Sequence, residues 1–266
     1  MRTFRRYWSL TIGQFMTNLA YPVGFFFTFL GNLIYIAILY FLWKAVYGTA
    51  EILHGMTFNQ TFVFLTFAGS IIILFQTNAD RIISWRILSG GIVIDLTKPL
   101  DFQVQSLAHE FGTVLFNGLV ITIPSMIVVF LFVPAEIPIG LNIPFFLVSL
   151  LGAYALSFML DFIVGLLAFY TESLWGISAT KDVLTSFLAG ALVPLAFFPE
   201  SMQQILRMLP FQAIYNIPLQ IATNAALTPA DYAQMLGVQL FWVIVFALGS
   251  RLFYRHVIAR LTINGG

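Results

Sequence analysis

Long stretches almost free of charge restrict most strongly how this chain can fold. The segment from Val23 to Val46 contains one charged residue, Lys44, and further apolar stretches follow it. A helix needs about 20 consecutive apolar residues to cross a bilayer. Only 9% of the chain is charged, whereas soluble domains carry roughly a quarter. The chain is therefore predicted to be an integral membrane protein in contact with the lipid bilayer.

The apolar stretches predict an all-α polytopic membrane protein with six transmembrane helices in a single domain, residues 1–266. A membrane barrel would need segments of about ten residues with alternating polarity, and the sequence shows no such segments. The predicted spans are approximately Val23–Val46, Asn59–Thr77, Glu110–Val133, Pro144–Tyr170, Val183–Phe198 and Met235–Tyr254.

Residues 2–19 predict an amphipathic helix that lies along the membrane surface. Basic residues at one end combined with an aromatic apolar face are typical of interfacial helices. A cleavable signal peptide is the alternative, but the apolar run begins late, is too long and lacks a small-x-small cleavage site. The basic residues are Arg2, Arg5 and Arg6, and the apolar ones at helical spacing are Phe4, Trp8, Ile12, Phe15 and Leu19.

Residues 78–108 form a long interval with polar residues and connect the second and third predicted spans. The pattern from Asp80 to Ser89 predicts a short helix. Gly90 and Gly91 end it, because glycine adopts the left-handed geometry after a helix at little cost. We expect this helix to be the docking element for a soluble partner.

The second half of this interval predicts a return to the membrane. Ile92-Val93-Ile94 is β-branched, which favours extended backbone. Pro99 keeps Lys98 out of helical geometry. Asp101 is predicted to cap the helix that leads into the third span.

The fifth predicted span is short and broken. Residues 171–182 form a polar break before it, and Gly190 and Pro194 interrupt it. Such interruptions mark discontinuous membrane segments, which persist at depth only where protein or a cavity surrounds them.

Residues 199–234 predict an external re-entrant hairpin before span six. Glu200 to Leu209 favours a short helix that Pro210 ends. The hairpin could insert partly and gate the outward end of a pathway. An ordinary kinked span followed by an interfacial helix explains the same pattern, and both interpretations stay open.

Basic residues are distributed unevenly between the two sides of the six-span arrangement. Ten of the 12 fall on one side, and cytoplasmic loops carry such an excess. Both termini and the 78–108 loop are therefore predicted to be cytoplasmic. The ten are Arg2, Arg5, Arg6, Arg81, Arg86, Lys98, Lys181, Arg251, Arg255 and Arg260, and the remaining two are Lys44 and Arg207.

The sequence lacks the motifs of an enzyme or a nucleotide-binding protein. It has no Walker-type phosphate loop and no cysteine, and His54, His109 and His256 lack metal-ligand spacing. The scattered basic residues do not form a stripe for nucleic acid. We therefore expect no catalytic, cofactor or metal site in this chain.

Asp161 is the one acidic residue well inside a predicted span. An unpaired carboxylate there costs several kcal/mol. It could contact a cation or line a water-filled path, or it could simply face the helix bundle in a pair. The paired interpretation is favoured, because no further acidic residues form a relay.

Several short motifs follow one another along most of the chain. They are Leu88-Ser89-Gly90, Leu96-Thr97-Lys98-Pro99, Ala168-Phe169-Tyr170-Thr171-Glu172, Gly190-Ala191-Leu192-Val193-Pro194-Leu195, Phe198-Pro199, Leu209-Pro210-Phe211, Pro218 and Gly265-Gly266. With this ordered set the chain resembles the permease subunits of type-two ABC exporters, in particular an uncharacterised bacterial, drug-export-like branch. Two positions depart from the family pattern: Tyr170, where it favours tryptophan, and Thr223-Asn224, where it favours glycine.

The resemblance implies a permease of the bacterial inner membrane that pairs with a second permease subunit, identical or related, and with two ATPase subunits that hold ATP and magnesium. It implies a cytoplasmic coupling helix between spans two and three. In this hypothesis Trp85 and Leu88 insert into the ATPase and charged residues orient it. The predicted docking residues are Trp85, Arg86, Leu88, Ser89, Gly90, Asp95, Lys98 and Pro99.

The same hypothesis places the substrate pathway and its gate at the broken fifth span. Two alternatives stay open: a stand-alone secondary transporter that uses Asp161, and a membrane scaffold that transports nothing. The predicted pathway residues are Asp161, Gly190, Pro194, Phe197, Phe198, Pro199, Pro210 and Phe211.

Overall fold

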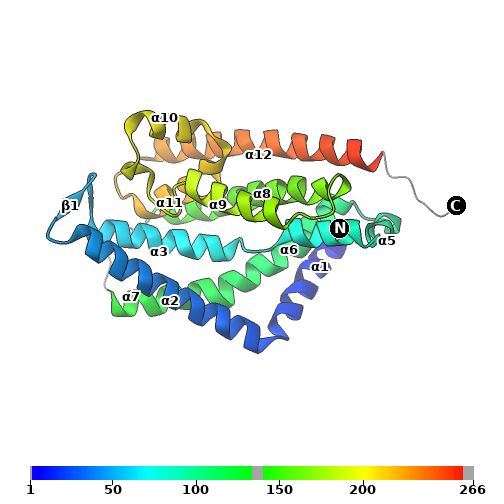
Figure 1. Ribbon diagram of the computed structural model, residues 1–266, viewed down its shortest axis with the longest axis horizontal. Coiled ribbons are helices and arrows are strands. Elements are labelled where there is room, and N and C mark those ends of the chain that lie inside the picture. Colours follow the sequence, from blue (N-terminus) through cyan, green and yellow to red (C-terminus); the bar gives the residue numbers. More distant parts are fainter. Residues whose placement is uncertain (1, 134–139, 260–266) are drawn as a thin grey trace.

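The computed structural model describes residues 2–133 and 140–259, and its helices run mainly along one long axis (Figure 1). Within these ranges, five helical segments are long and apolar enough to cross a bilayer. The all-α polytopic class is thereby confirmed. The five segments are Pro22–Tyr47, Phe58–Leu88, Phe102–Phe132, Asn142–Phe169 and Pro229–Ile258.

Helix α1 (Arg2–Leu19) confirms the predicted N-terminal helix and packs along α6 (Phe102–Phe116). The Thr11 hydroxyl donates to the backbone oxygen of Ala108 at 2.6 Å. Gly112 permits this close approach, because a Cβ at that position would overlap the backbone oxygen of Thr11. The helix is thus fixed to the domain by backbone contact.

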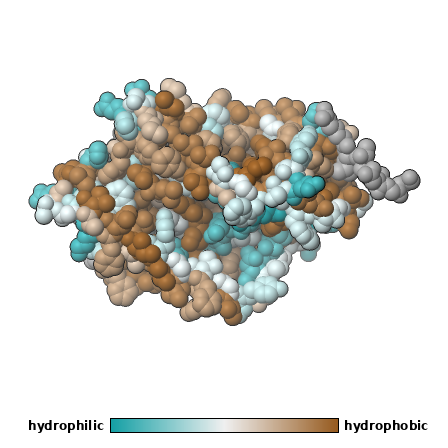
Figure 2. Space-filling model, viewed as in Figure 1, coloured by the Kyte–Doolittle hydropathy of each residue, from teal (hydrophilic) through white to brown (hydrophobic). Residues whose placement is uncertain are grey.

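Helix α2 (Pro22–Tyr47) is mostly exposed, and brown apolar atoms cover it in Figure 2. Exposed apolar surface over a whole helix is what lipid contact requires. Strands β1 (Ile52–Leu53) and β2 (Met56–Thr57) follow as a two-stranded antiparallel hairpin. This small sheet is an addition to the helical class, and positive φ at His54 and Gly55 allows its tight turn.

Helix α3 (Phe58–Leu74) is the most enclosed candidate span and lies centrally in Figure 1. Helix α4 (Ala79–Leu88) continues in nearly the same direction after a break, at which Asn78 is left-handed with φ 56°. Gly90 ends α4 with φ 76°, which confirms the predicted glycine stop.

One prediction in this interval is wrong. Residues 92–94 are not extended but open helix α5 (Ile92–Thr97). Ile92 is buried against the domain core, and this tertiary burial outweighs the modest β preference of branched residues. Pro99 stops the helix as expected, and Lys98 is extended.

The third span begins at Phe102, eight residues before the predicted Glu110. Asp101 caps it by accepting from the backbone nitrogen of Val104 at 3.1 Å, which confirms the predicted cap. A π-helical stretch η1 (Asn117–Thr122) joins α6 to α7 (Ile123–Phe132). Pro124 has no N–H for the preceding turn, and the wider π geometry accommodates this loss.

Helix α8 (Asn142–Leu166) continues as the 3₁₀ turn η2 (Leu167–Phe169) and matches the fourth predicted span. Two of the sequence features, Arg260 among the basic residues and the Gly265-Gly266 motif, lie outside the described residues.

The fifth predicted span, Val183–Phe198, is short and broken as expected, but its bounds differ in the structure. Helix α9 runs from Trp175 to Leu188, so most of the predicted polar break 171–182 is helical. Its 14 residues extend about 21 Å, too short for a hydrocarbon core of about 30 Å. Gly190 then reverses the backbone with φ 74°.

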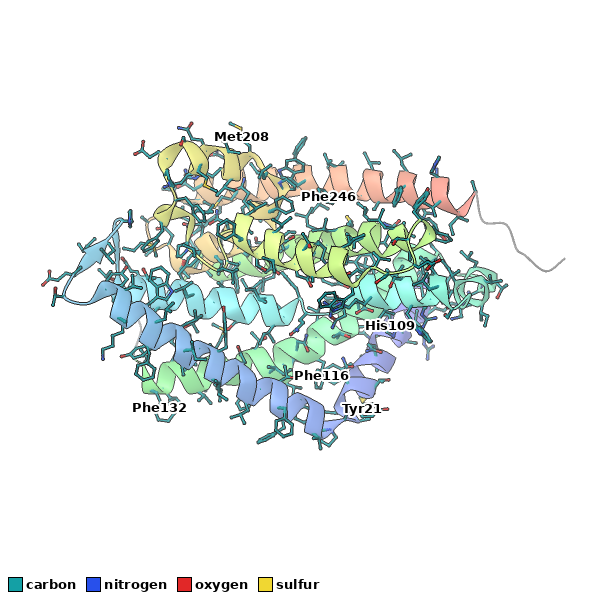
Figure 3. All side chains as sticks on the ribbon, viewed as in Figure 1. Tyr21, His109, Phe116, Phe132, Met208 and Phe246 are labelled. Carbon is teal, nitrogen blue, oxygen red and sulfur yellow. The ribbon has the colours of Figure 1, made fainter. Side chains whose placement is uncertain are left out.

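The interval 199–234 contains short helices, as expected for a hairpin. Helix α10 (Glu200–Met208) ends before Pro210, as predicted. Its Met208 lies at the edge of the molecule in Figure 3. The 3₁₀ turns η3 (Leu195–Phe197) and η4 (Pro210–Ala213) flank α10, and α11 (Asn216–Thr223) follows. Helix α12 (Pro229–Ile258) begins before the predicted Met235, because Thr228 and Asp231 form a capping box.

Candidate functional site

The α4–α5 turn stands at one end of the molecule (Figure 1). Arg86 Nη1 lies 2.5 Å from Asp95 Oδ2, and Lys98 Nζ lies 2.7 Å from Asp95 Oδ1. These two ion pairs join the two helices into one unit, which we call the α4–α5 tip (residues 85–99).

The Asp95 side chain lies inside the α4–α5 tip rather than on its surface. Its side chain is 1% exposed, so its predicted position at the rim of a docking surface is wrong. Burial favours the neutral acid, but hydrogen bonds from Lys98 and Arg86, together with their charges, outweigh it and hold the pKa of Asp95 below its usual value. Arg86 and Lys98 thus hold the α4–α5 tip together, with part of each side chain still in solvent.

Three apolar side chains project from the α4–α5 tip. Trp85 is 67% exposed, Leu88 49% and Ile94 68%. Ser89, Gly90 and Pro99 are exposed beside them. Ile94 is not evident as a surface residue from the sequence, because the β-branched run 92–94 favours extended backbone rather than a helix with its own exposed face.

The base of the α4–α5 tip packs tightly on α8. A Cβ on Gly165 of α8 would lie 2.9 Å from the Cβ of Ile83 and 3.0 Å from the backbone oxygen of Asp80. The two helices therefore approach each other so closely at Gly165 that no Cβ fits between them, and helices packed this closely do not slide independently. Gly165 was missed in the sequence, where it is one small residue in an apolar run.

A buried charge cluster joins α4, α8 and α9. Lys181 Nζ donates to Asp80 Oδ2 at 3.0 Å, contacts Asp182 Oδ1 at 3.0 Å, and makes its shortest contact with Asp161 Oδ1. Arg81 extends the cluster toward solvent through Asp182 Oδ2 at 3.5 Å. We call these five residues the Lys181 cluster.

The paired interpretation of Asp161 is confirmed. The carboxylates of Asp80, Asp161 and Asp182 lie within 4.8 Å of one another, an arrangement that could hold a metal ion. The Lys181 ammonium contacts all three, so a covalently attached cation already lies among them and offsets part of their negative charge. Such mutual pairing makes charges tolerable near the membrane.

The segment after α9 belongs to the opposite end of the molecule. A Cβ on Gly190 would lie 2.7 Å from Leu195 Cγ, so only glycine fits both the backbone and the space. The ring of Phe197 lies 4.9 Å from Trp43 and 5.0 Å from His54, centroid to centroid. These contacts attach the segment to α2 and to the β-hairpin.

The other predicted pathway residues surround this segment. Phe198 stacks edge-on with Phe187 at 5.3 Å. Pro194, Pro199 and Pro210 stand at the starts of η3, α10 and η4. Phe211 is half-buried against the domain core. Asp161 is separate from this group. It pairs with Lys181 of α9 and lies beside Asp80 of α4.

The sequence from residue 33 to residue 265 matches the family described as ABC-2 family transporter protein. The chain belongs to this family. The match covers most of the chain and confirms the resemblance to type-two ABC permeases. No curated protein matches the chain.

Membership of the ABC-2 family makes the chain a permease component of a membrane transporter, which is not itself catalytic. The exposed apolar helices agree with a membrane location (Figure 2). Three features of this permease are candidate functional sites: the α4–α5 tip, the Lys181 cluster and the segment around Gly190.

Proposed function

We propose that this chain is the membrane subunit of an ATP-driven exporter in the bacterial inner membrane. It forms the substrate pathway with a second permease subunit and docks two ATPase subunits through the α4–α5 tip. The ATPase subunits hold ATP and magnesium, and this chain holds no cofactor.

The exposed apolar side chains of the α4–α5 tip carry this proposal. The segment Phe58–Leu88 has 31 residues and extends about 45 Å at 1.5 Å per residue, whereas the hydrocarbon core is about 30 Å thick. The tip therefore projects beyond the lipid, where exposed Trp85, Leu88 and Ile94 need a protein partner. A tryptophan with apolar neighbours and a charged rim is a common interface anchor.

Charge supports a cytoplasmic position for the α4–α5 tip. Arg86 and Lys98 belong to it, and Arg81 and Lys181 lie at its base. Arg251 of α12 lies 2.6 Å from Asp101, at the start of α6. Basic residues from four helices thus gather at one end, and such an excess favours the cytoplasmic side.

Two contacts support transmission of movement from the α4–α5 tip. Closure of the ATPases on ATP would push the tip, and the tight contact at Gly165 would pass this displacement to α8. The Lys181 ion pairs would pass it to α9. Helix α9 leads to Gly190 and Pro194, where substrate would leave on the outer side.

Co-purification of the permease with its ATPase tests the proposal. Trp85→Ala combined with Ile94→Ala should abolish co-purification, because it removes the apolar anchors and leaves the Arg86–Asp95 pair intact. Phe132→Ala is the matched control, since Phe132 is 82% exposed and lies at the far end of α7 (Figure 3). Full ATPase retention by the double variant, or transport in liposomes without any ATPase, would contradict the proposal.

A further inference from the structure

A small cavity opens beside the Lys181 cluster. It has a volume of about 200 Å³ and lies where the α3–α4 break meets α8, α9 and the residue before α11. Taking about 30 Å³ for each water, it could hold six or seven waters or one compact organic molecule. Its lining is Ile72, Phe75, Gln76, Thr77, Asn78, Asp80, Arg81, Ser157, Leu160, Asp161, Lys181, Asp182, Thr185, Ser186 and Tyr215.

The charged residues around the cavity leave an excess of negative charge. Three acidic and two basic side chains line it. Lys181 bonds Asp161 through Oδ1, and Oδ2 of the same carboxylate makes no hydrogen bond with any residue that the structure describes. A cationic donor would satisfy this acceptor, whereas an anion would be repelled by three carboxylates.

A hydroxyl group on the cavity wall also lacks a partner. Tyr215 is 8% exposed, and its hydroxyl bonds to no described residue. This hydroxyl can accept a hydrogen bond from a ligand N–H. Thr185 lines the cavity too, but its unpaired Oγ1 is closed off from it.

The remaining wall is apolar and aromatic. Ile72, Phe75 and Leu160 line the cavity together with the Tyr215 ring. Aromatic faces attract ammonium groups, and apolar walls favour a hydrocarbon body. The cavity therefore combines free acceptors, negative charge and an apolar side.

We propose that this cavity binds a small primary amine with an apolar or aromatic body, and that such amines are a cargo class of the transporter. The ammonium group donates to Asp161 Oδ2 and to the hydroxyl of Tyr215, while its body lies against Phe75 and Leu160. The cargo role rests on the proposed function, but the binding itself does not.

The binding test uses the purified full chain in detergent, without ATPase. Phenethylamine should raise its unfolding temperature in a saturable manner, whereas 2-phenylethanol and 3-phenylpropionate, which match its body but not its charge, should not. Asp161→Asn and Tyr215→Phe should each weaken phenethylamine binding at least about tenfold, since each removes one hydrogen bond to the charged ammonium group.

Tyr170→Phe is the matched control for Tyr215→Phe, since Tyr170 is exposed and away from the cavity. Equal responses to the amine and the alcohol, or unchanged affinity in both cavity variants, would overturn the site and leave a water-filled cavity.

A second measurement separates the site from the transport function. In the complex with its ATPase, phenethylamine should stimulate ATP hydrolysis in the wild type and less in Tyr215→Phe. Binding without stimulation would overturn the cargo role while the site stands. Stimulation by other compounds with no amine binding would overturn the site while the exporter function stands.

Discussion

Removal of Lys181 should destabilise the protein more than removal of any exposed basic residue. Lys181→Met keeps the length of the side chain and deletes its charge. The ammonium contacts three carboxylates, and two of them, Asp80 and Asp161, are at most 10% exposed. The variant would leave these two buried charges next to one another without a counter-ion.

The size of the effect follows from burial. Breaking a buried ion pair by removing one partner costs about 3–5 kcal/mol, because the remaining charge is uncompensated. Asp182 adds little, because its side chain is 53% exposed and screened by water. For a chain of this length, such a loss lowers the unfolding temperature by on the order of 10 °C.

Thermal unfolding in detergent measures this loss. Lys44→Met is the control, since Lys44 is exposed and contacts only the ring of Tyr40 at 5.7 Å. Lys181→Met with Asp161→Asn should recover part of the stability, because it removes one unpaired charge. An unfolding temperature of Lys181→Met within about 1 °C of the wild type would refute the argument.

Three further predictions follow from local geometry. Gly165→Val should separate α4 from α8, so that ATPase binding persists but transport-coupled hydrolysis falls severalfold in a reconstituted complex; unchanged coupling would show that this contact transmits nothing. Gly190→Ala should cost about 1–2 kcal/mol in denaturant unfolding, because alanine is strained at positive φ and would meet Leu195. The lowered pKa of Asp95 means that its contribution is complete above about pH 4 and is lost as pH falls through that lowered value. Limited proteolysis of the α4–α5 tip should therefore accelerate only on the acid side, and Asp95→Asn should abolish this acid dependence.

The sequence was sufficient for the parts of the fold that depend on composition and local caps. Apolar runs identified the long helices, since lipid contact requires them. The Asp101 cap and the Gly90 stop depend on residues within one turn, so they could be predicted without tertiary information. The N-terminal helix and the end of α10 before Pro210 were predictable for the same reason.

Tertiary contacts explain the errors. Ile92 is buried in the core and starts a helix that its β-branched neighbours do not favour. Helix α9 begins at Trp175, inside a polar segment. This segment can be helical because Lys181 and Asp182 form ion pairs with residues about 20 and 100 positions earlier in the chain. A polar segment with distant partners resembles a loop when its neighbours are unknown.

The candidate sites divide in the same way. Trp85 and Leu88 were predicted as partner contacts, and both are exposed at the α4–α5 tip. Their docking role stays a prediction. The buried position of Asp95 could not be found, because it depends on α5 folding back on Arg86. Ile94, Gly165 and Tyr215 carry no sequence signal, since each becomes informative only through its neighbour in space.

Site-specific crosslinking of the assembled transporter tests the central proposal most directly. A photoreactive residue placed at Ile94 or at Trp85 should crosslink to the ATPase, because both side chains project from the α4–α5 tip beyond the lipid. The same residue at Phe132 should give no ATPase product. If the complex hydrolyses ATP and neither tip position crosslinks to the ATPase, the α4–α5 tip is not the docking site.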